Sequence, residues 1–359
     1  MSSPRRVSVI IPLLPEHRFS KESLESLARQ SFQDFDILFV DGGASTGFIS
    51  KLIEQANCLG LSCQWIHDHR ENISVLRNRG VIESRSEYVA FHNYPDLMMI
   101  SRIEEGVRLL DRRSDLVLAS SPVEILEPVQ EESPRSSPPS RHFQPWFESE
   151  KILEKLLKRT FPLPERTGLY HIPEATTLTV RRASILAAGL YDTRFSVAPW
   201  ATVELSVRLY LQGPFGRIGT PLVQKVFRSN TMTPEIWSRS MEQMDLFYLI
   251  LSWRTGATPD RETEQLLRIF RTRWLRYWSG WFFRYRTGRT LGIALALRAL
   301  LGNFLCLENW KWTLKSFFPQ SHYPRLFWFE RFIDAPVPSH LTRPGIGQIL
   351  SSNWRLPCP

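Results

Sequence analysis

An acidic residue at the end of an apolar run is the first feature of this chain that could do chemistry. Asp41 closes the strand-like run 36–40 and is followed by a loop of small residues, 42–47. An earlier strand-like run, Val7–Ile11, is stopped by Pro12, and an amphipathic helical pattern separates the two runs. This order predicts a βαβ unit. Ligands of open parallel sheets bind beyond the carboxyl ends of the strands, where Asp41 and its loop would lie.

Alternating strand-like and helical patterns continue to about residue 120. Further strand-like runs occur at Cys63–Ile66, Tyr88–Phe91 and Leu116–Ser120, and helical patterns at 21–30, 48–58, 74–84 and 100–110. We therefore expect an α/β fold with a mostly parallel central sheet.

A segment dense in Pro, Ser and Glu follows at about 127–142 and is interpreted as a mobile surface loop. Beyond it the pattern predicts a helix at Lys151–Lys158 with Ser149 as its N-cap. A strand is expected at about 175–180, with helices at 182–188 and 202–212.

Several of these segments resemble, in the same order, the motifs of the inverting family-2 glycosyltransferases. The resemblance covers roughly residues 5–230 and is carried by Val7–Pro12, Asp34–Gly43, Leu76–Gly80, Glu87–Phe91, Thr177–Arg182 and Gly189–Asp192. It implies a nucleotide-sugar-binding domain of the GT-A type over residues 1–235. The remainder, 236–359, is expected to be a helical, basic and aromatic-rich region.

The family holds Mg²⁺ or Mn²⁺ with an acidic pair, DxD, because a diphosphate leaving group develops negative charge that a hard cation neutralises. Aligning Tyr88–Phe91 with the family strand places this pair on Asn93 and Pro95, and a further acid on Asp96. Two interpretations stay open. Asp96 and Asn93 form a weakened metal site, or Asp96 caps a helix that starts near Ile100.

The family also needs a general base for the acceptor hydroxyl, which it takes from an acidic pair at a helix start. Glu204–Leu209 matches the second half of that pattern, but the acidic positions fall on Ala201 and Thr202. Glu204 is then the catalytic candidate that remains. It lies about 200° around a helix from Thr202, so it fits the role only if the local backbone differs. The alternative is a structural acid.

Four residues are implied as nucleotide contacts: Pro12, Asp41, Arg77 and Asn93. Asp41 stands where the family contacts the nucleobase, although its usual acidic neighbour is Gly42 here. Arg77 matches an arginine of the family and would offset diphosphate charge. The alternatives are a loop-capping role for Asp41 and an ion pair at a helix end for Arg77.

The C-terminal part carries the chain's excess charge. Residues 261–331 contain 13 Lys and Arg against 4 acidic residues, which accounts for the whole net charge of +9. Trp, Tyr, Arg and Lys settle at bilayer headgroups, so a peripheral membrane contact through 265–307 competes with ordinary helix packing. A spanning helix at 291–307 is disfavoured because the run is short and contains Arg298. No nucleic-acid-binding motif accompanies the basic segment, so no nucleic-acid partner is expected.

Composition and cysteines fit a cytoplasmic protein. Hydrophobic residues make up 43% and charged residues 23% of the chain, which is typical of a globular protein. The four cysteines lack zinc-site spacing and are interpreted as reduced packing residues. The apolar run after Arg5 and Arg6 predicts a core strand and not a signal peptide. We expect a cytoplasmic location. A peripheral position on the inner face of the plasma membrane is the open alternative.

Two functions remain open from the sequence. The first is an active glycosyltransferase that moves a sugar from a nucleotide-sugar to a polysaccharide or lipid-linked acceptor. The second is a catalytically inactive relative that serves as scaffold or partner in polysaccharide assembly. The substitutions at Asn93, Pro95, Ala201 and Thr202 motivate the second.

Overall fold

The computed structural model describes residues 4–15, 17, 20–126, 147–160, 173–226, 234–254, 260–284, 289–303, 307, 309–310 and 313. The loop expected at 127–142 lies outside these residues. The described residues divide into two compact units, one drawn from 4–126 and 173–247 and the other from 147–160 and 248–313. The division runs through a helix, about a dozen residues beyond the boundary expected at 235, and it assigns 147–160 to the second unit.

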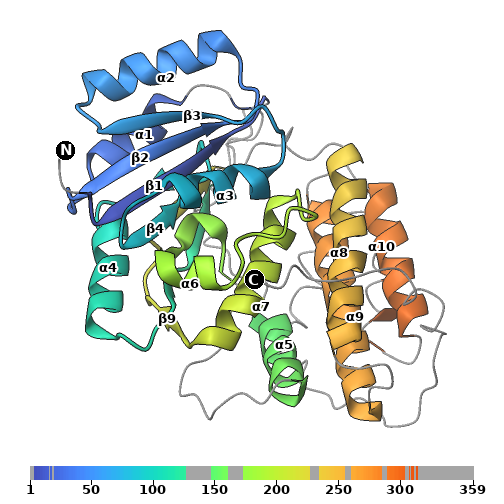
Figure 1. The fold of residues 1–359 in the computed structure, drawn as a ribbon. Coiled ribbons are helices and arrows are strands. Elements are labelled where there is room, and N and C mark those ends of the chain that lie inside the picture. Colours follow the sequence, from blue (N-terminus) through green and yellow to red (C-terminus); the bar gives the residue numbers. More distant parts are fainter. Residues whose placement is uncertain are drawn as a thin grey trace. The chain divides into compact units, whose positions relative to one another are not determined.

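A seven-stranded sheet forms the centre of the first unit (Figure 1). Its strands are β1 (Val7–Leu13), β2 (Phe35–Asp41), β3 (Cys63–His67), β4 (Tyr88–Phe91), β6 (Leu118–Ser120), β8 (Thr179–Arg181) and β9 (Phe215–Arg217), in the order β3-β2-β1-β4-β8-β6-β9. The first four strands are parallel, β8 is antiparallel to both neighbours, and β9 is parallel to β6. The expected mostly parallel α/β fold is confirmed.

Helices cover both faces of this sheet because its strands are apolar on both faces. One face of β1 contributes Val7, Val9 and Ile11 to a core that includes residues of α1 (Lys21–Ala28), α2 (Thr46–Cys58) and α4 (Arg102–Arg112). The other face presents Ile10 to α3 (Ile73–Glu83). A Cβ at Gly80 of α3 would lie 2.5 Å from Ile10 Cγ2, so the glycine lets helix and strand pack closely.

A second, three-stranded sheet was not expected from the sequence. It consists of β5 (Leu97–Met98), β10 (Val223–Val226) and β7 (Val123–Leu126), in that order. β10 is antiparallel to β5 and parallel to β7. In this small sheet β10 pairs with two strands that lie 100 residues or more before it in the chain.

The remaining elements of the first unit are η1 (Ala175–Thr177), α6 (Arg182–Ala187), α7 (Ala198–Gln212) and the first part of α8 (Pro234–Arg254). The strand expected at 175–180 is therefore a 3-10 turn followed by the short strand β8. It is too short to have been recognised by its alternation alone.

The second unit is helical and contains α5 (Phe147–Thr160), α9 (Arg261–Arg284) and α10 (Arg289–Gly302). Ser149 lies inside the first turn of α5, so its expected role as N-cap is wrong. α9 packs against both α10 and α5. The buried apolar side chains include Phe270 and Trp274 on α9 and Leu295 and Leu300 on α10. Helix packing thus accounts for part of the aromatic pattern. Among the described helices none is long and apolar enough to cross a membrane.

Candidate active site

Asp41 ends β2 at the carboxyl edge of the sheet and is 5% exposed. Its Oδ1 accepts hydrogen bonds from the backbone N–H groups of Gly43 and Ala44, at 3.0 and 2.8 Å. Gly43 has a φ of 104°, a left-handed conformation that favours glycine. Asp41 Oδ2 lies 3.1 Å from Nδ1 of His67, at the end of β3. Asp41 therefore organises the small-residue loop, and its nucleobase contact stays a prediction.

Gly42 occupies a position with no room for a side chain. A Cβ there would lie 2.7 Å from Leu76 Cδ1 and 2.9 Å from the carbonyl oxygen of Arg70. Its N–H donates to the carbonyl of Leu13, which holds the ends of β1 and β2 together. The nucleotide-contact candidate Pro12 is buried one residue earlier in β1. The acid that the family pattern has at this position cannot be accommodated here without movement of α3.

Arg77 lies on α3 and is fully buried. Its Nη2 donates to Asn93 Oδ1 at 2.9 Å. The guanidinium carbon lies 5.2 Å from the ring centroid of Tyr191 and 5.9 Å from that of Phe91, within cation–π range. Burial lowers the pKa of Arg77. The alternative interpretation for Arg77, an ion pair at a helix end, is wrong for the described residues, because none of their ion pairs includes it.

The segment that follows β4 brings Asn93 and Asp96 to the same edge of the sheet. The N–H of Asp96 donates to the carbonyl of Asn93 at 2.7 Å, which makes a tight turn. Asp96 is buried and precedes β5. It is not the cap of the next helix, because α4 begins at Arg102 with Ser101 at its N-cap. That part of the sequence interpretation is wrong.

Two charged residues that the sequence analysis missed lie beside this segment. Lys225 is on β10, and its Nζ lies 3.3 Å from Oε2 of Glu174, the residue before η1. Burial works to lower the pKa of Lys225, but the negative charges of Glu174 and Asp96 outweigh burial and leave this pKa raised. The sequence could have indicated Lys225, because it lies two residues from Val223 and so shares a strand face with that buried residue.

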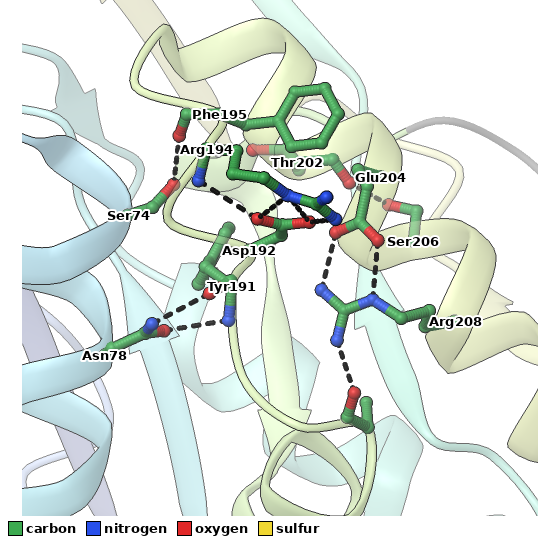
Figure 2. A network of polar contacts seen from close by, with 11 residues as sticks. Ser74, Asn78, Tyr191, Asp192, Arg194, Phe195, Thr202, Glu204, Ser206 and Arg208 are labelled. Carbon is green, nitrogen blue, oxygen red and sulfur yellow. Dashed lines mark hydrogen bonds and ion pairs between the residues drawn. The ribbon is translucent and has the colours of Figure 1, made fainter. Parts of the chain in front are cut away.

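Glu204 lies on α7 and is fixed by Arg208 one turn further along the same helix (Figure 2). Arg208 Nε donates to Oε1 at 2.6 Å and Nη2 donates to Oε2 at 2.5 Å. The Glu204 side chain is 3% exposed. Burial raises its pKa, and the ion pair with Arg208 opposes that rise. This arrangement is the one expected of a structural acid, and the role of Glu204 as general base is untested.

The same network connects α3 to the loop that carries Tyr191 (Figure 2). Asn78 donates through Nδ2 to the carbonyl of Tyr191 and accepts through Oδ1 from its N–H, both at 2.8 Å. Asn78 is the neighbour of Arg77. Helix α3 therefore carries the guanidinium of Arg77 and, through Asn78, fixes the backbone of Tyr191, whose ring lies beside that guanidinium.

The residues at 93–96 do not fit a divalent cation. Mg²⁺ and Mn²⁺ prefer carboxylate oxygens, and Asp96 supplies the one carboxylate of this segment. Asn93 Oδ1 already accepts from Arg77, and Pro95 has no side-chain ligand atom. Within the described part of the chain, no three His, Cys, Asp or Glu side chains are grouped so that they could hold a metal ion.

Residues 8–170 match the sequence model of the Glycosyl transferase family 2. An uncharacterized glycosyltransferase of Rickettsia bellii is 28% identical over 109 residues, which are 30% of this chain and 16% of that protein. The putative glycosyltransferase EpsH of Bacillus subtilis is 23% identical over 114 residues, 32% of this chain and 33% of that protein. The chain thus spans one third or less of the length of these relatives.

Solved structures share the fold over most of the chain. S. aureus TarS 1–349 in complex with UDP-GlcNAc has a TM-score of 0.51 at 13% identity, covering 89% of this chain and 92% of that one. The mannosyltransferase PcManGT from Pyrobaculum calidifontis, in complex with GDP-Man and Mn²⁺, has a TM-score of 0.51 at 14% identity, with coverage of 88% and 85%. At these identities the similarity shows the fold alone.

Proposed function

We propose that this chain, whose residues 8–170 match the glycosyltransferase family 2 model, transfers a sugar from a nucleotide-sugar donor to a glycan or lipid-linked acceptor. The observation that carries the proposal is the arrangement at the carboxyl edge of the sheet. The loop held by Asp41 and the buried guanidinium of Arg77 both lie there, on elements that the family model covers. UDP-GlcNAc and GDP-Man are bound by proteins of the same fold, which supports a nucleoside-diphosphate donor.

In such a transfer the acceptor oxygen attacks C1 of the donor sugar while the bond from C1 to the diphosphate oxygen breaks. The electron pair of that bond stays on the diphosphate, so negative charge grows at the leaving group. Asp41 and its loop would contact the nucleobase, with Pro12 and Asn93 lining the nucleotide. Arg77 would contribute positive charge near the leaving group.

The acceptor hydroxyl must also lose a proton. Glu204 is the base that the motif pattern offers, and it would have to release a bond from Arg208 before taking a proton. Its raised pKa suits proton uptake, whereas its geometry favours a structural role. A divalent ion has no adequate ligand set at 93–96, so no step is assigned to one.

Calorimetric titration of the whole chain with UDP-, GDP- and dTDP-sugars tests the proposal. We expect one nucleobase class to bind and the corresponding sugar nucleotide to be slowly hydrolysed when no acceptor is present. Absence of binding to every donor would refute the proposed function. Tight binding with no hydrolysis and no transfer would favour the inactive alternative.

A variant at Asp41 tests the nucleobase contact. Asp41→Asn keeps an oxygen that can accept from Gly43 and Ala44 but removes the charge. We expect nucleotide affinity to fall about ten-fold, because hydrogen bonds to an ionised acceptor are roughly twice as strong as neutral ones. Asp34→Asn, on an aspartate whose side chain is 46% exposed, is the matched control and should bind as the parent does.

We also propose that the acceptor is met at a membrane surface through 265–307. Leu297, Leu301 and Leu307 are exposed apolar residues in this range, and Leu301 is 80% exposed. The excess of basic residues in 261–331 would add attraction to anionic lipids. Pelleting with anionic liposomes should fall as salt is raised, and Leu301→Ser should weaken it. Equal pelleting with neutral and anionic vesicles would contradict the proposal.

A further inference from the structure

The diphosphate of the proposed donor needs positive charge in an environment where divalent-cation ligands are missing. Asn93 and Pro95 replace the residues that would hold an ion, yet the same place contains two cationic side chains. Arg77 donates to Asn93, and Lys225, on the strand beside β5, pairs with Glu174. All of these residues belong to the first compact unit.

Arg77 is a buried cation with unused hydrogen-bonding capacity. Its Nε and Nη1 are buried and make no hydrogen bond to the described residues. Taking an ion from water into a protein interior costs several kcal/mol unless a partner compensates. The aromatic rings of Phe91 and Tyr191 compensate in part, and an anion that came close to Nε and Nη1 would compensate further.

Lys225 is placed by the small sheet. In the antiparallel pairing of β10 with β5, Val223 lies opposite Met98 and Gln224 opposite Leu97. Lys225 follows Gln224 and Asp96 precedes Leu97, so both residues lie at the same end of this pairing. Its side chain is 30% exposed and is therefore not sealed in the core.

The pairing of Lys225 with Glu174 is suited to exchange. The Nζ–Oε2 distance is 3.3 Å, longer than the 2.7–2.9 Å of strong charge-assisted bonds. Lys225 is a flexible point charge with three donors, whereas a bidentate arginine would be committed to its carboxylate. The ammonium can therefore turn from Glu174 to a phosphate oxygen without leaving its strand.

We propose that Lys225 and Arg77 neutralise the donor diphosphate in place of a divalent cation, so that this chain binds nucleoside diphosphates without metal. This inference rests on the proposed function. As the bond to C1 breaks, the electron pair remains on the diphosphate, and the guanidinium and the ammonium group would offset the charge that develops. The acceptor oxygen forms the new bond to C1, and its proton passes to a base or to water.

The test is calorimetric binding of UDP, GDP and dTDP to the full chain, first in EDTA and then with added Mn²⁺. We expect equal affinity in both buffers. Lys225→Met should lower the affinity for the nucleoside diphosphate by about ten-fold or more, because it removes a charged partner. It should change the affinity for the corresponding monophosphate much less. Lys225→Arg keeps the charge but can pair with Glu174 through two hydrogen bonds, so we expect an affinity between those of the parent and of Lys225→Met. Lys51→Met, at an exposed lysine of α2, is the control and should bind as the parent does.

Different failures have different meanings. Binding that requires Mn²⁺ would overturn this inference and leave the proposed function standing. Parental affinity in Lys225→Met would do the same. If no nucleotide binds in either buffer, both proposals fall. Circular dichroism of each variant shows whether it is folded, and Lys225→Arg provides the readout should Lys225→Met not fold.

Discussion

Replacement of Gly42 by alanine tests how tightly the candidate site is built. The added Cβ would lie 2.7 Å from Leu76 Cδ1, 2.9 Å from the Arg70 carbonyl oxygen and 3.2 Å from the Leu13 carbonyl oxygen. Leu76 is fully buried, and the other two neighbours are backbone atoms, so none of them yields cheaply. We expect Gly42→Ala to lower the free energy of unfolding by about 1–3 kcal/mol, the usual cost of overpacking.

Gly47→Ala is the matched control, because no heavy atom lies within 4 Å of the Cβ it adds. Gly47 lies in the first turn of α2, where alanine should stabilise by about 0.5–1 kcal/mol. The two substitutions add the same methyl group and should move stability in opposite directions. The difference would arise because position 42 has no room for the added methyl group.

Urea unfolding is the assay, with hydrogen exchange of peptides from β1 and β2 to report on this sheet separately from the helical unit. Gly42→Asp should be worse than Gly42→Ala, because the same space must then hold a carboxylate. Nucleotide binding should fall with it, since α3 carries both Leu76 and Arg77. If Gly42→Ala is as stable as the parent within about 0.5 kcal/mol, which is the range of ordinary surface substitutions, the close packing described here is refuted.

Three further substitutions have defined outcomes. Burial, with a smaller contribution from Arg102, lowers the pKa of His92 from 6.5 to about 3, so the folded state binds fewer protons than the unfolded state between these values. Stability should therefore fall on acidification through this window by up to about 1.4 kcal/mol per pH unit, and urea unfolding of His92→Gln should show a shallower dependence. Glu204→Gln leaves Arg208 without its carboxylate and should lower the free energy of unfolding by about 3–5 kcal/mol. Adding Arg208→Met should recover most of that loss. Sugar transfer by the folded double variant would exclude Glu204 as the base. Arg102→Met removes the donor to Thr179 Oγ1 and to two backbone carbonyls, and should cost about 1–3 kcal/mol for each acceptor left unsatisfied, as measured by thermal unfolding.

The parts of the fold that the sequence predicted are those with long, regular apolar patterns. Val7–Ile11 and the run ending at Asp41 are buried strands, and their parallel pairing follows from the helix between them. Asp41 could be located at the carboxyl edge for the same reason, whereas Arg77 was singled out only by its match to the family motif. Periodicity also placed the helices that cover the sheet, within a few residues at their ends.

The missed parts depend on short or distant pairings. β5 has two residues and β10 has four, so neither shows a usable alternation. The pairing of β10 with β5 joins segments more than 100 residues apart, and no local pattern in the sequence indicates it. The expected capping by Asp96 failed because β5 intervenes before α4 begins. The ion pair of Glu204 with Arg208 could have been anticipated, since the two are four residues apart on a helix.

The place of β10 in the small sheet has a consequence for Lys225. The strand order is β5-β10-β7, and Lys225 lies opposite Ile125 in the parallel pairing with β7. The backbone that carries the proposed diphosphate cation therefore belongs to the central strand, and substitutions in either flanking strand can shift that cation without touching it.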